Sequence, residues 1–180
     1  MNEQELPNLH SMLVNDSITL ISDPYPRIAT TLDHMRDVWR SLRAQTHTRK
    51  SNTRPLTRLH VHTLAYQAIM TDTTSGWKNS MSAAAKASLV AHRHTCGSDY
   101  IHLSKTKILM DDSFTTSRHS DGQRMPMDSE RPVSCWTETI DGPESSQVEI
   151  CIAPVLVCTE VKQTGGGGDN VSSAGLVLQI

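Results

Sequence analysis

Two histidines and a cysteine alternate in the segment AHRHTCG, at His92, His94 and Cys96, immediately before Gly97. Imidazole and thiolate groups are common zinc ligands. Successive helical residues turn by about 100°, so His92 and Cys96 lie about 40° apart while His94 lies on the far side of a helix. The segment therefore provides at most half of a metal site, and it equally fits the basic last turn of a helix that ends at Gly97.

A second pair of histidines, His60 and His62, has the spacing of one face of a strand, which is a frequent half of a metal centre. Acidic partners are scarce in this region, because Asp72 is the one acid between Asp37 and Asp99. Zinc is therefore an alternative hypothesis, and no cofactor is the main expectation. The zinc hypothesis rests on four residues: His60, His62, His92 and Cys96.

Common catalytic motifs do not occur in the chain: there is no G-x-S-x-G, no H-E-x-x-H, no Walker loop and no G-x-G-x-x-G. The run Gly165–Gly168 lacks the Lys-Ser/Thr of a phosphate loop, and no helical pattern is recognisable after it. A flexible loop is the expectation for this run. Binding is therefore favoured over catalysis.

Charge is distributed unevenly along the chain. Counting Lys and Arg against Asp and Glu, residues 1–35 carry a net −4, residues 36–107 carry +9 and residues 108–180 carry −7. Arg36, Arg40 and Arg43 recur at helical spacing, and the polar run THTRKSNTR continues the basic segment. Either this segment contacts an anionic partner, or it is a solvated helix face that the acidic tail neutralises.

The favoured hypothesis is a small interaction protein that binds a nucleic acid or an acidic protein through its basic segment. The residues expected to make that contact are Arg36, Arg40, Arg43, Arg49, Lys50, Arg54 and Arg58. Besides zinc binding, a further alternative is a weakly selected reading frame, because Ser, Thr and His are abundant while large apolar side chains are few. The sequence does not fix the oligomeric state.

The four cysteines, at positions 96, 135, 151 and 158, contain no C-x-x-C pair, so reduced thiols are the expectation. The N-terminal segment has acids where a signal peptide has bases, and no apolar run reaches the roughly 18 residues of a membrane helix. We therefore expect a soluble chain in the cytoplasm or nucleus that has no contact with membranes.

Three helices are expected in the first hundred residues, at 24–46, 55–70 and 80–96. The first has the clearest pattern, since apolar residues recur at spacings of three and four from Ile28 to Leu42. The second begins at Pro55, although the alternation of Leu59, His60, Val61 and His62 also permits a strand. The third is alanine-rich and ends before Gly97.

Strands are expected in the last third of the chain, in VSCWTETI and QVEICIAPVLVC, on either side of the turn Asp141-Gly142-Pro143. Pro154 requires the second run to be an edge strand, to be bulged or to divide into two strands. The sequence thus predicts an α+β protein: a mainly helical segment at 1–110, a polar linker at 111–131 and a small antiparallel sheet at 132–180, with disordered linkers.

Overall fold

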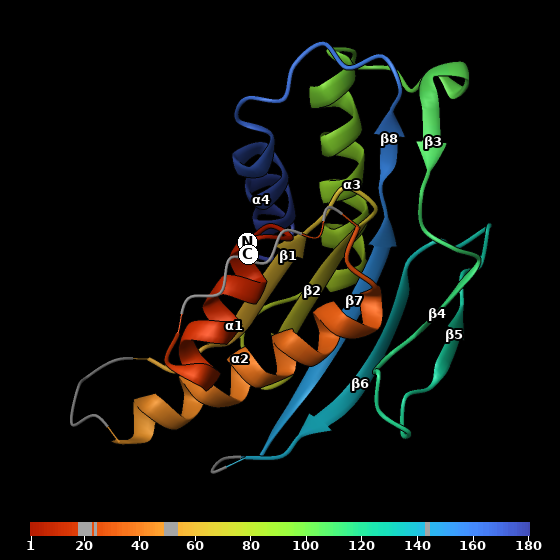
Figure 1. Cartoon of the computed structure of the whole chain (residues 1–180). Coiled ribbons are helices and arrows are strands. Elements are labelled where there is room, and N and C mark those ends of the chain that lie inside the picture. The colour runs from red at the N-terminus through yellow and green to blue at the C-terminus, as the bar shows by residue number, and fades with distance from the viewer. Residues whose placement is uncertain (18–22, 24, 49–53, 143–144) are drawn as a thin grey trace.

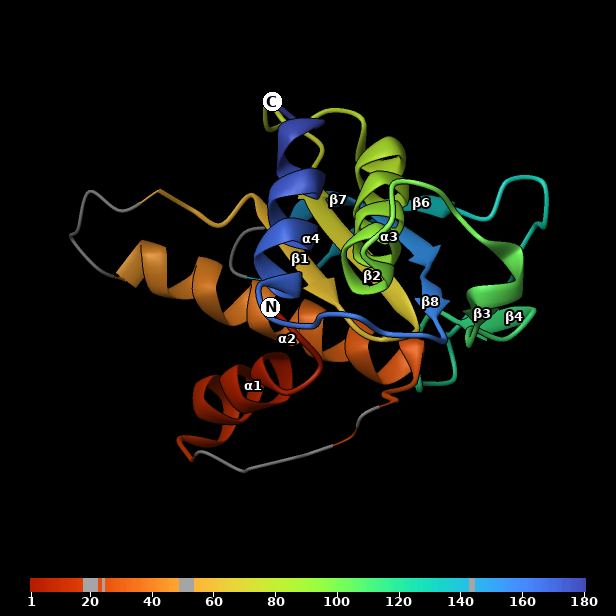
Figure 2. The same cartoon turned by 90° about the horizontal axis from the view of Figure 1, so that it is seen from above.

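A four-stranded antiparallel sheet lies between two pairs of helices in the computed structural model, which describes residues 1–17, 23, 25–48, 54–142 and 145–180. Helices α1 and α2 cover one face of this sheet, and α3 and α4 cover the other (Figures 1 and 2). In spatial order the strands are β1 (Arg58–His62), β2 (Tyr66–Asp72), β7 (Ser146–Pro154) and β6 (Ser134–Ile140).

The remaining elements surround this sheet. The helices are α1 (Glu5–Asn15), α2 (Ile28–Thr48), α3 (Ser80–Cys96), the short 3₁₀ helix η1 (Leu103–Lys105) and α4 (Gly167–Val177). Two small antiparallel pairs are formed by β3 (Thr106–Ile108) with β8 (Leu156–Cys158), and by β4 (Ser113–Thr115) with β5 (Arg124–Pro126).

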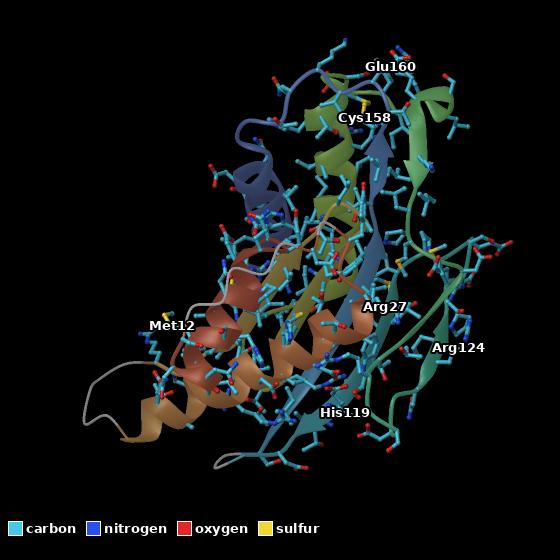
Figure 3. All side chains as sticks on the ribbon, viewed as in Figure 1. Met12, Arg27, His119, Arg124, Cys158 and Glu160 are labelled. Atoms are coloured by element: carbon cyan, nitrogen blue, oxygen red, sulfur yellow. A yellow bond between two sulfur atoms is a disulfide. The ribbon has the colours of Figure 1, made fainter. Side chains whose placement is uncertain are left out.

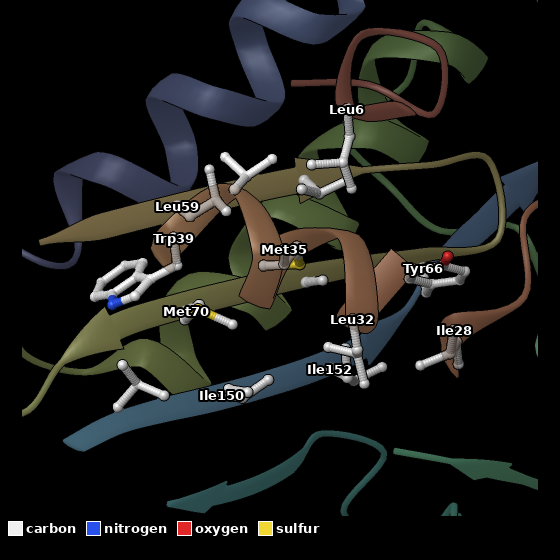
Figure 4. Packing of buried hydrophobic residues seen from close by; sticks show 14 of the residues in the cluster. Leu6, Ile28, Leu32, Met35, Trp39, Leu59, Tyr66, Met70, Ile150 and Ile152 are labelled. Carbon is white, nitrogen blue, oxygen red and sulfur yellow. The ribbon is translucent and has the colours of Figure 1, made fainter. Parts of the chain in front are cut away.

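The main hydrophobic core lies between α2 and the sheet (Figure 4). Helical spacing places Ile28, Leu32, Met35 and Trp39 on one buried stripe of α2, as the sequence predicts. The stripe packs on apolar side chains from three strands: Leu59, Val61, Tyr66, Ala68, Met70, Val148, Ile150 and Ile152. Two polar atoms in this core are paired, since Trp39 Nε1 donates to Ser146 Oγ over 2.9 Å and Tyr66 Oη lies 2.7 Å from Thr31 Oγ1.

The opposite face of the sheet is covered by small residues. Ala83 and Ala84 of α3 are fully buried against Ile69, Cys151 and Ala153. Residues without bulk allow a helix to approach a sheet closely. The alanine-rich run of α3 thus serves packing as well as helix propensity.

The predicted helix at 55–70 is wrong, because these residues form strand β1 and the start of β2. The alternation that the sequence analysis noted is the physical reason: Leu59 and Val61 point to the α2 core, while His60 and His62 point to α4. The predicted helix at 80–96 is confirmed, and the one at 24–46 is confirmed as 28–48. Helices α1 and α4 were not predicted.

The α+β class is confirmed, but helices and strands are mixed along the chain. Residues 111–131, expected to be a polar linker, include the hairpin β4–β5. Strand β2 from the first half pairs with β7 from the last third over seven residue pairs. Segments on both sides of residues 111–131 therefore form one sheet. The division of the chain into domains at 1–110, 111–131 and 132–180 stays a prediction.

The strands predicted in the last third are confirmed as β6, β7 and β8. Pro154 is the last residue of β7, so the long apolar run divides into two strands, one of the three outcomes expected. Among the described residues, no helix is long and apolar enough to cross a lipid bilayer.

The expectation of reduced thiols is wrong, because the structure contains two disulfides. Cys96 at the end of α3 bonds to Cys158 at the end of β8, with Cα atoms 5.6 Å apart. Cys135 and Cys151 face each other across β6 and β7, with Cα atoms 4.2 Å apart. The bonded partners are 62 and 16 residues apart in sequence, and only folding brings them together.

Candidate functional site

The arginines of α2 are used in internal ion pairs. Arg36 donates from Nε and Nη2 to both carboxylate oxygens of Glu138, over 2.6 and 2.9 Å, and from Nη1 to Asp33 over 3.0 Å. Burial raises the pKa of Glu138, but hydrogen bonds from Arg36 and Trp136 outweigh it and hold that pKa below its ordinary value. Arg36 thus fastens α2 to β6 and is not available to a partner.

The other predicted contact residues are also engaged or lie apart. Arg43 donates to Asp72 over 2.7 Å, and Arg40 donates to Asp37 over 2.8 Å. Arg58 donates from Nε to Gln179 over 2.6 Å, and its guanidinium lies over the ring of Trp77. Arg54 is exposed just before β1, and Arg49 and Lys50 lie outside the described residues. The basic segment therefore does not form one continuous surface in the described part of the chain.

His60 and His62 lie side by side on β1, with ring centroids 6.4 Å apart. His60 is buried, its Nε2 lies 3.0 Å from Gln67 Oε1, and burial lowers its pKa to about 3. Burial also lowers the pKa of His62. Both imidazoles are therefore neutral at pH 7, and both face α4.

The remaining zinc candidates do not join these two histidines. His92 is fully buried and its Nδ1 lies 2.8 Å from the carbonyl oxygen of Leu156. Cys96 is bonded to Cys158, so its sulfur has no thiolate form to offer a metal. Across the part of the chain that the structure describes, no group of three His, Cys, Asp or Glu side chains is arranged to hold a metal ion.

The glycine tract, Gly165–Gly168, leads directly into helix α4. Gly166 has a φ of 76°, a left-handed conformation that glycine adopts without steric cost, and it caps the helix that begins at Gly167. The first N–H groups of any α-helix have no partner within the helix and carry the positive end of its dipole. A glycine-rich loop at a helix start is an arrangement suited to a phosphate group.

Neighbouring residues hold the glycine tract in place. His94 Nε2 lies 2.8 Å from the carbonyl oxygen of Gly165, and Gln163 Nε2 lies 3.1 Å from His94 Nδ1. The Gln163 amide is a donor, so His94 accepts at Nδ1 and donates from Nε2 to Gly165. Lys162 N donates to the carbonyl oxygen of Thr95 over 2.8 Å, next to the disulfide of Cys96. The end of α3 thus fixes the approach to α4.

Helix α4 packs directly on the histidines of β1 at two residues that lack side chains. A Cβ atom at residue 168 would lie 3.3 Å from His62 Cε1, and one at residue 175 would lie 3.1 Å from His60 Cε1. Seven residues are two helical turns, so Gly168 and Gly175 lie on the same stripe of α4. Each histidine ring of β1 therefore occupies the space that a side chain at the facing glycine of α4 would need.

A cavity of about 310 Å³ opens beside the start of α4. His62, Thr63 and Gln67 line it from β1, β2 and the turn between them, and Thr164 and Gly167 line it from the glycine tract side. Asn2 and Glu3 also line this cavity, and Asn2 pairs with His62. The cavity therefore combines polar groups, including the Glu3 carboxylate, and apolar side chains such as Val155 and Val171 with the start of a helix, at the end of the sheet where β1 and β7 finish.

The first turn of α4 itself carries one carboxylate. Asp169 lies in the first turn of α4 and is exposed. A carboxylate next to a phosphate-binding helix start can accept a proton from a hydroxyl group that attacks the phosphate. The arrangement thus offers two of the elements that phosphoryl transfer uses, a helix start suited to an anion and a carboxylate that can act as a base.

The chain matches a known protein family over almost its whole length. The model of the conserved region of ADP-specific phosphofructokinase/glucokinase matches residues 1–178. The chain belongs to this family. It is 32% identical to ADP-dependent glucokinase of Bos taurus over 127 residues, which are 71% of this chain and 24% of the bovine protein.

A solved structure supports the fold. The chain resembles the structure titled the last common ancestor of ADP-dependent phosphofructokinases from Methanosarcinales, with a TM-score of 0.50 and 17% identity. The match covers 98% of this chain and 35% of the other. The chain therefore spans about a quarter to a third of the length of these relatives.

Family membership overturns the function expected from the sequence. The chain is related to sugar kinases, so the hypothesis of an interaction protein that binds nucleic acid or acidic protein through a basic segment is wrong. The alternative functions, a zinc-binding protein and a weakly selected reading frame, are contradicted by the same family membership. The paired arginines of α2 agree with this correction, because their charge is balanced within the fold.

The residues that sequence reasoning missed are the glycine tract and Asp169. The sequence shows no clear helical pattern after the tract, since GGDNVSSAGLV contains Gly, Asn, Val and Ser, all weak helix formers. One signal was available: an acid and an asparagine directly after the glycines are typical of a helix start.

Proposed function

We propose that this chain forms the phosphate-binding part of an ADP-dependent sugar kinase, with ADP as the phosphoryl donor and a hexose as the acceptor. The observation that carries the proposal is the glycine tract running into the start of α4, with Asp169 in the first turn of that helix and Gly167 lining the 310 Å³ cavity. The names of the relatives supply the donor and the class of sugar.

The glycine tract and the first N–H groups of α4 hold the β-phosphate of ADP in this proposal. Backbone N–H groups suit this task because they are fixed in direction and approach the ligand closely where no Cβ intervenes. His62 and His60 lie under α4 as neutral imidazoles, so they position the helix without adding charge. The positive end of the helix dipole then faces the anion.

Asp169 acts as the base in the proposed reaction. It accepts the proton of a hexose hydroxyl group while the hydroxyl oxygen forms a bond to the β-phosphorus of ADP. The bond between that phosphorus and the bridging oxygen breaks, and AMP leaves with the bonding electron pair. The products are a hexose phosphate and AMP.

Titration calorimetry of the purified chain with ADP tests the phosphate-binding part of the proposal. A Gly168→Val variant places branched methyl groups between α4 and His62, where even a Cβ would lie only 3.3 Å from the ring. We expect this variant to bind ADP at least about 10-fold more weakly, because the first turn of α4 is displaced from the phosphate. The matched control is Gly76→Val, since no atom lies within 4 Å of a Cβ at residue 76.

The base is tested separately. An Asp169→Asn variant should retain ADP affinity within about 3-fold but lower the rate of AMP release with glucose at least about 100-fold, the usual contribution of a general base. Asp121→Asn, an exposed acid on the β4–β5 loop, is the control. The proposal would be contradicted if the unmodified chain did not bind ADP. It would also be contradicted if Gly168→Val and Gly76→Val weakened the affinity for ADP equally.

A further inference from the structure

A second cavity lies away from the glycine tract. It has a volume of about 920 Å³ and opens between the start of α2 and the hairpin β4–β5. No residue lines both this cavity and the 310 Å³ cavity beside α4. Its size is within the range of small-molecule sites in proteins.

Three arginines line this second cavity from separate segments: Arg27 before α2, Arg118 in the loop after β4 and Arg124 on β5. Figure 3 shows Arg27 at the start of α2 and Arg124 on the hairpin, with His119 near the end of the loop between β4 and β5. Asp111 is the one acid in the lining. The cavity therefore has an excess of positive charge, although the segment 108–180 as a whole carries −7.

Two of the three arginines are held by hydrogen bonds, and the three are not neutralised as a group. Arg118 donates from its backbone N and from Nε to one oxygen of Asp33, over 3.0 and 3.2 Å, and Asp33 also accepts from Arg36. Arg124 donates from Nε and Nη2 to the hydroxyl of Ser113, which carries no charge. The Arg27 side chain is exposed and makes no hydrogen bond or ion pair within the described residues, although the Arg27 carbonyl oxygen accepts from Thr31 N.

The floor of the cavity is apolar. Ile28, Met110 and Phe114 line it and are each 8% exposed, and the largely exposed ring of Tyr25 stands at its edge. Sites for small organic ligands combine such apolar walls with a few polar groups that fix the orientation. Guanidinium groups match the geometry of phosphate oxygens and bind them through paired hydrogen bonds.

We propose that this cavity is a second ligand site, which binds a small phosphorylated metabolite. Its phosphate lies among Arg27, Arg118 and Arg124, and its organic part covers Ile28, Met110 and Phe114. The first N–H groups of α2 border the same cavity and add to the positive potential. This site is independent of the proposed ADP site, because it uses other residues on the opposite face of the sheet.

Pyrophosphate is the probe, and amide NMR spectra of the ¹⁵N-labelled chain locate where it binds. We expect shifts at residues 28–30 and at Arg118 that saturate with pyrophosphate. An Arg27→Gln/Arg124→Gln double variant should weaken this saturation at least about 10-fold, since two of the three guanidinium groups are lost. The melting curve from circular dichroism checks that the variant is folded.

The control is an Arg40→Gln/Lys86→Gln double variant, which removes the same charge from exposed positions that do not line the cavity. It should leave the affinity within about 2-fold. Equal weakening in both double variants would mean that only net charge matters, and it would overturn the proposal. Shifts confined to residues 165–169 would also overturn it, because pyrophosphate would then bind only at α4.

Discussion

Buried histidines make the folded chain sensitive to acid. Burial lowers the pKa of His60 to about 3, whereas the unfolded chain keeps the ordinary value near 6.5. Below pH 6.5 the unfolded chain therefore binds a proton that the folded chain does not. The stabilising contribution of the neutral His60 is complete above pH 6.5 and is lost progressively as the pH falls toward 3.

A His60→Gln variant tests this pH dependence. Between pH 7.5 and 5.0 we expect the unfolding free energy of the unmodified chain to fall by about 2 kcal/mol more than that of the variant, because the variant has no group to protonate at this position. Urea unfolding at the two pH values measures the difference. His102→Gln, at an exposed position, should behave like the unmodified chain, and parallel losses in all three proteins would refute the assignment.

At the residue scale, sequence reasoning found side chains but not their surroundings. The alternation of His60 and His62 permits a strand that places both side chains on one face, and zinc binding there is an alternative hypothesis beside the main expectation of no cofactor. The structure fills that face with α4, whose glycines at 168 and 175 come from a segment about 110 residues later in the chain. Local spacing carries no information on such a distant partner.

At the element scale, α2 is anchored to the edge strand β6 by a buried ion pair. The side chains of Arg36 and Glu138 are 13% and 22% exposed, and two parallel hydrogen bonds join them. An Arg36→Met variant leaves Glu138 without its main partner in a largely buried position. We expect the unfolding free energy to fall by about 3 kcal/mol, as measured by urea denaturation.

The pair of Arg40 and Asp37 serves as the control for Arg36. Both of its side chains are more than 40% exposed, so Arg40→Met should cost less than about 1 kcal/mol. Adding Glu138→Met to the Arg36 variant should recover part of the loss, since no charge then stays unpaired. A loss of stability that is equal for the two arginine variants would show that the ion pair does not anchor α2.

Helices with a strong local pattern were predictable, and the others were not. Helix α2 has a regular apolar stripe and α3 has an alanine-rich interior with a glycine after its end, so both were found within a few residues of their bounds. Helix α4 contains three glycines and two serines, and packing against β1 supplies the stability that its own residues lack. The helix that forms the candidate site therefore depends on tertiary contacts, which the local sequence does not show.

At the scale of the whole molecule, the two disulfides close loops of different length. Cys96–Cys158 spans 62 residues and Cys135–Cys151 spans 16. Chain entropy assigns about 4 kcal/mol to the longer loop and about 3 kcal/mol to the shorter. We therefore expect Cys96→Ala/Cys158→Ala to destabilise the chain more than Cys135→Ala/Cys151→Ala in urea unfolding. The reverse order would show that local packing outweighs loop closure.

The disulfides also bear on where the chain resides. A cytoplasmic or nuclear location stays a prediction, and glutathione in those compartments keeps thiols reduced. Trapping of thiols with an alkylating reagent in intact cells tests it. Four alkylated cysteines would support that location, while protection of Cys96 and Cys158 would contradict it.

Gly168 and Gly175 are two points at which α4 contacts the histidines of β1. A Cβ at position 175 would lie 3.1 Å from His60 Cε1, so a larger side chain there must displace either His60 or the helix whose first turn borders the cavity. In the proposed function, a change at position 175 therefore weakens phosphate binding from two helical turns away.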